Sequence, residues 1–311
     1  MGESYFRPIA KSWAKEVETN PVLEECDYLF FPGYAHIALF LSKKIKVFFF
    51  SDATAYLMMD YYWHNINKLS RRMSFNLDVA AVKNALVNIR SSQWAVNSLI
   101  EEYQCNKNNC YILEFGPNID TKDIRQSQPY KGGQLHILFS GIDWNRKGGD
   151  MAVKIVEILR SNGYDVHLNV VGPRTEPLNC KDKPYIDYFG YLDKNIEKEY
   201  FEYIKLYGKS HLLLLPTKAE CSAIVYSEAA AAGLPCYTYM TGGASNYVIN
   251  GLNGYALPEG ASAQAFVDQI INDIQTGKLM KLGQGAQKLF KEKLNWETWS
   301  NGFSKILQGL E

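Results

Sequence analysis

Apolar runs of strand length alternate with amphipathic segments along most of the chain, the order expected of parallel sheets covered by helices on both faces. In the first part, strands are predicted at residues 28–32, 46–51, 87–91 and 110–115, and helical segments at 35–42, 55–86 and 92–103. In the second part, strands are predicted at 135–141, 166–172, 188–192, 211–216 and 235–239, and helices at 149–160, 195–207, 223–232 and from 262 onward. The pattern predicts an α/β protein.

The two parts differ in completeness. Residues 117–134 are polar with Pro and Gly at both ends, which predicts a linker. The second part is a complete doubly wound, Rossmann-like unit, whereas the first opens on a polar, helix-like segment and reaches its first strand only at Tyr28. We expect an incomplete first domain over 1–128, because the sequence lacks its beginning or because the natural chain is short. A second domain over 129–295 and a terminal helix over 296–311, packing back toward the first domain, complete this expectation.

The charge and cysteine content of the chain argue against several classes of ligand. The 311 residues include 33 Lys plus Arg and 33 Asp plus Glu, so no net charge attracts a nucleic acid. The six Cys have no Cys-x-x-Cys spacing and no His cluster beside them, which predicts neither a zinc site nor a disulfide framework. Reduced thiols in the cytoplasm are the simplest interpretation.

Membrane signals are weak. The amino terminus has no apolar signal region, and Phe6 stands where a myristoylation motif needs Ser or Thr. The most apolar stretch, IALFLSKKIKVFFF, is interrupted by three lysines, which is too early for a membrane span. We expect a soluble cytoplasmic protein, with peripheral contact at the inner membrane face left open.

A basic loop follows the first strand of the second part. Its sequence, FSGIDWNRKGGD (139–150), leads from the strand through Gly141 to Arg146, Lys147 and Gly148 at the start of a helix. Free backbone N–H groups and the positive end of the helix dipole favour an anion there, and two cationic side chains add full charges. A phosphate is the natural ligand. The alternative is a solvated basic helix start.

Two glutamates flank the start of another predicted helix, in ECSAIVYSEAAAAGLPC (220–236). Glu220 falls in the loop after a buried strand, and Glu228 falls one turn or more into the helix, which Gly233 ends. Buried carboxylates need hydrogen-bond partners, and the neighbouring Ala, Ile and Val offer none, whereas the vicinal diol of a sugar or ribose does. Two exposed glutamates on a surface helix remain an equal alternative on spacing alone.

A third stretch, MTGGASNYVINGLNGYALP (240–258), places Gly242 and Gly243 directly after a predicted strand. Glycines in that position allow the backbone to approach a ligand closely. Two Asn-Gly turns follow. A flexible turn without ligand contact is the alternative.

Together these stretches resemble the donor-binding half of retaining glycosyltransferases of the GT-B fold, specifically glycosyltransferase family 4. Glu220 and Glu228 match the family's two glutamates separated by seven residues, residues 141–149 match its basic loop, and 241–243 match its Thr-Gly-Gly segment. Trp296-Glu297 is a further match, and the likeness covers about 135–311. SDATAY, SSQWAVNSLIEEY and EFGPNID in the first half resemble the family more weakly. The resemblance implies two Rossmann-like domains facing a cleft.

The resemblance also implies roles for individual residues. Lys147 and Arg146 hold the donor pyrophosphate, Glu228 binds the ribose hydroxyls, and Glu220 contacts the transferred sugar. Backbone amides contact the sugar and the phosphates at Gly141, Gly148, Cys221, Ser222, Ala223, Ile224, Gly242 and Gly243. The base lies near Pro173, Arg174 and Tyr191. Many members carry Arg where this chain has Ile142, so Arg146 is expected to supply that charge from the next turn.

The implied reaction moves a sugar from a nucleoside-diphosphate donor to a glycan, a lipid-linked acceptor or another hydroxyl, with retention of the anomeric configuration, as in polysaccharide biosynthesis. No Asp-x-Asp occurs in the sequence. We therefore expect no metal and no cofactor, with helix amino termini and cationic side chains stabilising the leaving diphosphate. Neither glutamate is expected to act as a nucleophile.

The acceptor side is less defined. Family members often present a His from the loop that SDATAY resembles, and this loop has none, which leaves Asp52, Thr54 and the more distant His36 as candidates. Three other functions stay open: a non-catalytic donor-binding subunit, a nucleotide-sugar epimerase and a sugar phosphorylase on the same fold.

Overall fold

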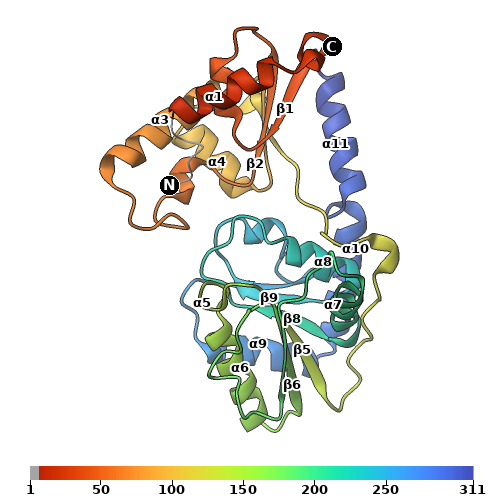
Figure 1. Ribbon diagram of the computed structural model, residues 1–311. Coiled ribbons are helices and arrows are strands. Elements are labelled where there is room, and N and C mark those ends of the chain that lie inside the picture. Colours follow the sequence, from red (N-terminus) through yellow and green to blue (C-terminus); the bar gives the residue numbers. More distant parts are fainter. Residues whose placement is uncertain (1–6, 311) are drawn as a thin grey trace. The chain divides into compact units, whose positions relative to one another are not determined.

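The computed structural model describes residues 7–310, and the chain divides into two compact units, Met1–Leu113 and Glu114–Glu311 (Figure 1). The interpretation of Phe6 and part of the search for an amino-terminal signal fall outside the described residues. Among those that are described, no helix combines the length and the apolarity that crossing a bilayer requires.

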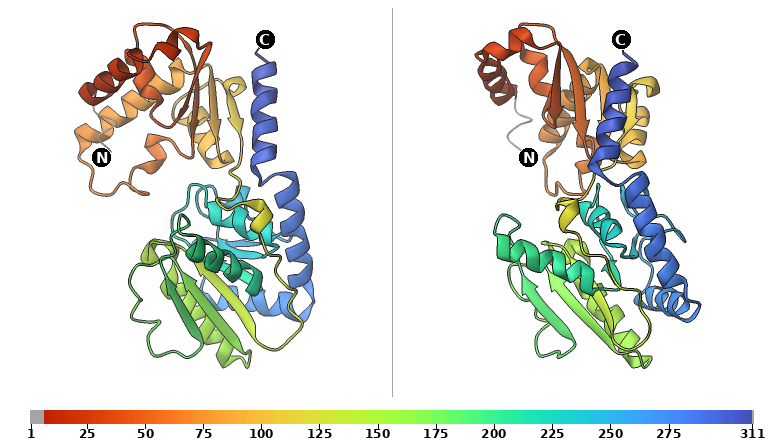
Figure 2. Two further views of the ribbon diagram at one scale, coloured as in Figure 1. Left: turned by 45° about the vertical axis from the view of Figure 1, so that its right-hand side comes forward. Right: turned by 90° about the vertical axis from the view of Figure 1, so that its right-hand side faces the viewer.

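The first unit is a four-stranded parallel sheet in the order β1-β2-β3-β4 with helices packed on it (Figure 2). Its strands are β1 (Tyr28–Pro32), β2 (Lys46–Ser51), β3 (Val87–Arg90) and β4 (Cys110–Ile112). Its helices are α1 (Arg7–Glu18), α2 (Ala55–Met58), α3 (Lys68–Asn84) and α4 (Gln93–Glu101), with 3-10 helices η2 (Pro21–Glu25), η3 (Ala35–Phe40) and η4 (Lys107–Asn109). Val47 and Phe49 of β2 point into a core shared with η3 and α3.

The four strands predicted for this unit are present, and its helices differ from the prediction. The single helix predicted over 55–86 is two helices, because Asp60 and Asn65 between them adopt positive φ angles of 65° and 59°. Each helix then starts at its own side-chain cap, Thr54 for α2 and Asn67 for α3. The segment at 35–42 is a 3-10 helix rather than an α-helix.

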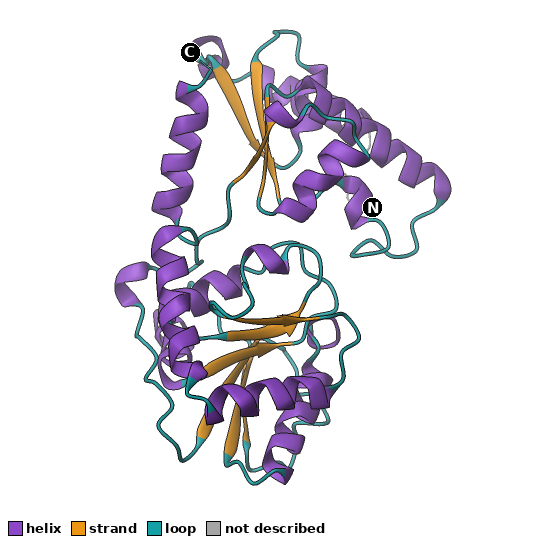
Figure 3. Ribbon diagram, turned by 180° about the vertical axis from the view of Figure 1, so that it is seen from behind, coloured by secondary structure: helices purple, strands orange, loops and turns teal. Residues whose placement is uncertain are grey.

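The second unit is a six-stranded parallel sheet with helices on both faces (Figure 3). Its strands are β5 (Leu135–Ser140), β6 (Val166–Val171), β7 (Ile186–Gly190), β8 (Leu212–Leu215), β9 (Cys236–Tyr239) and β10 (Gly254–Leu257). Its helices are α5 (Trp144–Lys147), α6 (Gly149–Ser161), α7 (Glu197–Lys209), α8 (Ile224–Ala232), α9 (Ala263–Gln275), α10 (Lys278–Glu292) and α11 (Trp296–Gln308), with 3-10 helices η5 (Thr121–Asp123) and η6 (Ala244–Asn246).

The strand order of this sheet is β10-β9-β8-β5-β6-β7, and it reverses direction at β5. The chain starts at β5, builds outward through β6 and β7, and then returns to the other side of β5 with β8. In open parallel sheets, ligands bind beyond the carboxyl ends of the strands at such a reversal. The loops after β5 and β8 are the two that carry the basic loop and Glu220.

Two predictions for the second unit and one for the first unit need correction. The strand predicted at 188–192 runs from Ile186 to Gly190, because Gly190 turns the chain with φ of 70°. A further strand, β10, lies where only turns were predicted, since its short apolar run GYAL follows two Asn-Gly pairs. The strand predicted over 110–115 ends at Ile112.

The segment predicted to be a linker is part of the second unit. The Ser127 N–H donates to the carbonyl of Ala232 at 2.8 Å, and the Gln126 side-chain amide donates to the carbonyl of Ala231 at 2.9 Å. The compact units accordingly separate between Leu113 and Glu114, earlier than the predicted division after residue 128.

Candidate functional site

The basic loop is built by one short helix that the sequence pattern did not predict. Asp143 caps α5 by accepting the N–H of Arg146 at 3.0 Å, so Arg146 and Lys147 leave the same helical turn. Gly148 then turns the chain with φ of 77°, and a Cβ there would lie 2.0 Å from the carbonyl oxygen of Pro216. Only glycine allows the loops after β5 and β8 to approach this closely.

Both cations of the basic loop converge on Glu220. The Lys147 ammonium donates to Glu220 Oε2, and an Arg146 guanidinium nitrogen lies 3.6 Å from the same oxygen. The guanidinium also donates to the carbonyl of Ala219 at 2.9 Å. The loop after β8 is therefore tied to the loop after β5 by charge-assisted contacts.

The amino terminus of α8 points into the same region without a side-chain cap. Ala223 stands at the cap position and cannot satisfy the first N–H groups of the helix. The Ser222 hydroxyl beside it is 8% exposed and has no hydrogen-bond partner among the described residues. Unsatisfied donors at a helix amino terminus favour an anionic ligand.

Glu228 is 2% exposed and has three partners, which corrects the expectation that its neighbours offer none. Its Oε2 accepts the hydroxyls of Tyr203 at 2.6 Å and Tyr207 at 2.8 Å, both from α7. Its Oε1 accepts the Lys194 ammonium at 2.6 Å. Burial and the Glu228 carboxylate raise the pKa of both phenols well above 10.

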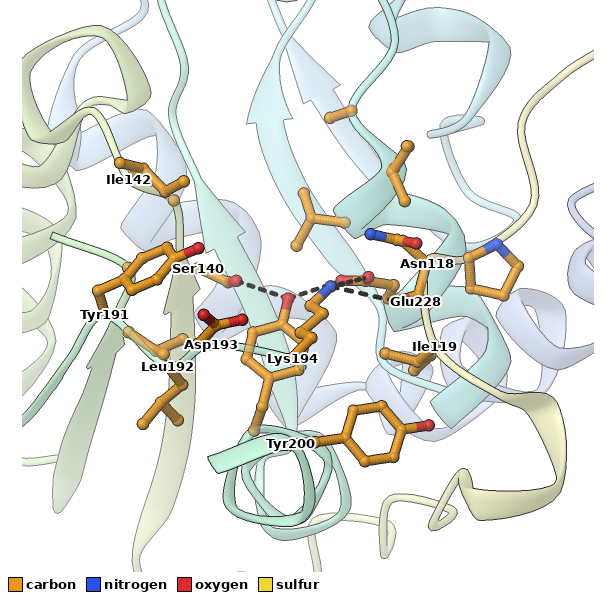
Figure 4. Close-up of a pocket in the computed structure, with 18 of the residues that line it drawn as sticks. Asn118, Ile119, Ser140, Ile142, Tyr191, Leu192, Asp193, Lys194, Tyr200 and Glu228 are labelled. Atoms are coloured by element: carbon orange, nitrogen blue, oxygen red, sulfur yellow. Dashed lines mark hydrogen bonds and ion pairs between the residues drawn. The ribbon is translucent and has the colours of Figure 1, made fainter. Parts of the chain in front are cut away.

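These groups share one pocket of about 830 Å³ within the second unit (Figure 4). That volume lies in the range of small-molecule sites, about 300–1,000 Å³. The predicted site residues that line it are Gly141, Arg146, Lys147, Tyr191, Glu220, Ser222, Ala223, Ile224 and Glu228. Ile142, where a family arginine was expected, also lines the pocket and is 60% exposed. Tyr191 and Ile142 lie on the side opposite Glu228 (Figure 4).

Other predicted residues lie outside that lining: Gly148, Cys221, Pro173, Arg174, Gly242 and Gly243. Cys221 is buried, and the Gly243 N–H already donates to the backbone carbonyl of Glu220 at 3.0 Å, so that amide shapes the loop. The Pro173 carbonyl accepts the Tyr188 hydroxyl. Arg174 reaches the site indirectly, because its guanidinium lies 4.3 Å from the ring centroid of Tyr191.

The acceptor-side candidates all lie in the first unit. Thr54 is buried, caps α2 and lies 2.8 Å from the Ser98 hydroxyl, and His36 is buried within η3. The burial of Thr54 and His36 and the capping role of Thr54 explain these two residues without an acceptor. Asp52 is exposed on the loop after β2. Their acceptor role stays a prediction.

The sequence reasoning missed Lys194 and the two tyrosines that hold Glu228. Tyr203 and Tyr207 are spaced i, i+4, so they share one face of α7, and this spacing was a usable signal. Lys194 precedes α7 in a polar loop with no distinguishing pattern. Asn118, whose carbonyl lies 3.4 Å from the Lys194 ammonium, falls in the stretch that was interpreted as a linker.

Part of the chain matches a known protein family, and its fold resembles solved structures. The family model of the glycosyl transferases group 1 matches residues 120–289. The structure resembles lipopolysaccharide outer core galactosyltransferase WaaB (TM-score 0.70, 13% identity, 97% of this chain and 79% of that one). It also resembles sucrose-phosphate synthase from Thermosynechococcus elongatus (TM-score 0.73, 16% identity, 96% of this chain and 77% of that one). A third similar structure is Anabaena HepE (TM-score 0.71, 15% identity, 97% of this chain and 82% of that one). No curated protein sequence matches the chain.

The chain belongs to the glycosyl transferases group 1 family. Its structural neighbours are GT-B glycosyltransferases, which confirms the predicted fold of two parallel α/β units.

Proposed function

We propose that the chain is a retaining, metal-independent glycosyltransferase of family 4. It transfers a sugar from a nucleoside-diphosphate donor to a hydroxyl of a glycan or a lipid-linked acceptor. One observation carries this proposal: Lys147 and Arg146 converge on Glu220 beside the uncapped amino terminus of α8. Two cations, a helix amino terminus and an unpartnered buried hydroxyl form a site for a diphosphate.

The donor then extends across the pocket. Its diphosphate lies between Lys147 and the first N–H groups of α8, where Ser222 supplies a further donor. Its ribose lies toward Glu228 and its base toward Tyr191. Glu220 faces the transferred sugar, whose hydroxyls donate to the carboxylate.

Charge stabilisation drives the reaction in this proposal. As the bond between the sugar and the phosphate oxygen breaks, negative charge grows on the diphosphate, and Lys147, Arg146 and the α8 dipole stabilise it without rearrangement. Glu220 is paired with both cations, which makes it a poor nucleophile. The acceptor oxygen therefore attacks the anomeric carbon from the side of the departing diphosphate, gives its proton to a phosphate oxygen and leaves the configuration retained.

Structural neighbours support the choice of donor. The structures of HepE with UDP, of HepE with UDP and glucose, and of the pneumococcal O-GlcNAc transferase GtfA with UDP and GlcNAc share this fold. A lipid-linked acceptor is presented at a membrane, so the proposal includes a cytoplasmic location with peripheral contact at the inner membrane face.

Calorimetry with UDP, GDP and ADP, followed by hydrolysis assays with the corresponding sugars, tests this function. We expect one nucleotide to bind at micromolar to millimolar concentration, turnover that persists in EDTA, and a product anomer of the donor's configuration by NMR. Glu220→Gln should lower turnover, whereas the exposed Glu259→Gln should not. Binding without any turnover in the presence of acceptor extracts indicates a donor-binding subunit instead, and inhibition by EDTA contradicts the metal-independent mechanism.

A further inference from the structure

Two of the six cysteines come together in the first unit, although their spacing in the sequence indicates no pair. Cys105 follows α4, Cys110 is the first residue of β4, and the single turn of η4 connects them. Both sulfurs approach the carbonyl oxygen of Asn106, which lies 3.8 Å from Cys105 Sγ and 3.4 Å from Cys110 Sγ. The two thiols are also in hydrogen-bond contact with each other.

The side chain of Asn88 lies beside this pair. Asn88 is the partner of Cys110 in the parallel ladder of β3 and β4, so the two side chains share one face of the sheet. The amide nitrogen of Asn88 donates to the Val82 carbonyl at 3.0 Å and lies 3.7 Å from Cys105 Sγ. Its amide oxygen is buried and has no hydrogen-bond partner among the residues that the structure describes. A thiol is only a weak donor, whereas a hydroxyl on the Cys105 sulfur would offer this amide the donor that it lacks.

The surroundings of Cys105 also favour its reactive form. The hydrogen bond from the Cys110 thiol lowers the pKa of Cys105 to about 7, with smaller help from the charges of Arg90 and Lys83 and against the opposing effect of burial. The thiolate is the form of cysteine that attacks oxidants. Cys105 is partly exposed, so a small oxidant can reach its sulfur. Cys180 is the opposite case, because burial raises the pKa of that thiol to about 11.

A metal ion is the other ligand that two neighbouring thiols suggest. Structural zinc sites have four protein ligands. Within the described ranges of the chain, no group of three or more His, Cys, Asp or Glu side chains is placed to hold a metal ion. Chemistry between the two sulfurs is therefore favoured over metal binding.

We propose that Cys105 and Cys110 form a redox modification site, at which a hydroperoxide oxidises Cys105 and Cys110 then closes a disulfide with it. In the first step the Cys105 thiolate attacks one peroxide oxygen, an S–O bond forms, the O–O bond breaks, and the departing oxygen takes up a proton. With hydrogen peroxide the products are a sulfenic acid and water. Neither cysteine lines the pocket of the second unit, so this inference does not rest on the proposed function.

The second step joins the two sulfurs. The Cys110 sulfur attacks the Cys105 sulfur, an S–S bond forms, the S–O bond breaks, and hydroxide leaves as water with the Cys110 proton. The two sulfurs together lose two electrons, and the peroxide gains them. Contact with Cys105 is the largest cause that raises the pKa of Cys110 in the reduced protein. Conversion of Cys105 to a sulfenic acid removes that thiolate, so Cys110 releases its proton more readily for this step.

The experiment is peptide mapping by mass spectrometry after the reduced wild-type chain has been treated with one equivalent of hydrogen peroxide and then alkylated. We expect one disulfide, between Cys105 and Cys110, with the other cysteines alkylated. In Cys110→Ser, dimedone should trap a sulfenic acid on Cys105 at least about tenfold faster than on Cys26, which is also partly exposed. The rate of oxidation should rise with pH around the Cys105 pKa of about 7.

Matched variants separate the pair from general thiol oxidation. Cys26→Ser removes a partly exposed cysteine of the same unit and should leave disulfide formation unchanged, whereas Cys105→Ser should leave Cys110 unlabelled by dimedone. Thermal unfolding of the reduced variants shows whether they fold, and the wild-type mapping needs no variant.

Two results would overturn the inference. One is alkylation of both Cys105 and Cys110 in wild-type protein after a peroxide treatment that fully oxidises glutathione. The other is dimedone labelling of Cys110→Ser that is as fast on Cys26 as on Cys105. Either result leaves the proposed function intact, because nucleotide binding and sugar transfer are measured separately on the reduced chain.

Discussion

Gly148 offers a test of how the site is assembled, because a matched glycine lies at the other end of the same helix. Gly148 precedes α6 with φ of 77°, and Gly163 follows it with φ of 86°. A Cβ at Gly148 would lie 2.0 Å from the Pro216 carbonyl oxygen, whereas a Cβ at Gly163 would have nothing within 4 Å. Alanine at either position suffers the same backbone strain, and only Gly148→Ala also adds a collision between the loops after β5 and β8.

The expected magnitudes follow from that difference. The left-handed conformation costs alanine about 1–2 kcal/mol, and the stiffer unfolded chain offsets about 0.4–1 kcal/mol, so Gly163→Ala should lose about 1 kcal/mol of unfolding free energy. The collision at Gly148 forces one loop to move by about 1 Å, and overpacking of this kind adds about 1–3 kcal/mol.

Urea denaturation followed by circular dichroism measures both variants. We expect Gly148→Ala to unfold at a clearly lower urea concentration than Gly163→Ala, and its nucleotide affinity to fall because Lys147 is the preceding residue. Equal midpoints for the two variants would refute the close approach of the two loops.

Three further results are expected. Lys147→Met should lower the transfer rate about 10²–10³-fold, as the loss of one charge-stabilising donor does in other enzymes, while the exposed Lys154→Met stays near wild type; equal rates contradict the diphosphate site. Tyr207→Phe removes a hydrogen bond to the buried Glu228 carboxylate and should lower the free energy of unfolding, measured by urea denaturation, by about 1.5–3 kcal/mol. A decrease of less than about 0.5 kcal/mol would mean that the Tyr207 hydroxyl does not stabilise Glu228. Burial, and to a smaller extent the neighbouring His136, lower the pKa of His211 in the folded chain to about 4. In the unfolded chain the pKa of this histidine is about 6.5, so between these two pH values the unfolded chain binds one more proton than the folded chain. The free energy of unfolding should therefore fall by about 1–2 kcal/mol as the pH is lowered from 6.5 to 4, a value discounted for partial exposure of His211. The free energy of unfolding of the His211→Gln variant should fall by less over the same range. If the two proteins lose stability in parallel, His211 is not the cause of the pH dependence.

Strands β5, β6, β8 and β9 were predictable because they are largely apolar runs in which nearly every residue is buried, which leaves little ambiguity in type. The failures have local causes. β10 was missed since Asn-Gly pairs before it predict turns, and only pairing with Cys236–Tyr239 makes GYAL a strand. The helix over 55–86 was predicted as continuous because nothing in the sequence announces that Asp60 and Asn65 adopt positive φ.

Part of the candidate site was predictable because two loops that follow buried strands carry charged residues. Glu220, Lys147 and Arg146 were identified from charge and position after a strand, and the structure brings these three together. Lys194 was not, since its position depends on the packing of α7 against α8, which no local pattern encodes. The prediction that the base lies near Pro173, Arg174 and Tyr191 stays a prediction, and in the structure the Arg174 guanidinium contacts the ring of Tyr191.

Glu228 shows why a buried carboxylate should not by itself be taken to indicate a ligand. Its apolar neighbours in sequence suggested a group without partners, yet α7 supplies two phenols and the loop before it supplies a cation. The useful question is therefore which acceptor site of the carboxylate the protein leaves open. Because Tyr203, Tyr207 and Lys194 already hold the Glu228 carboxylate, its burial alone carries no evidence for a ligand.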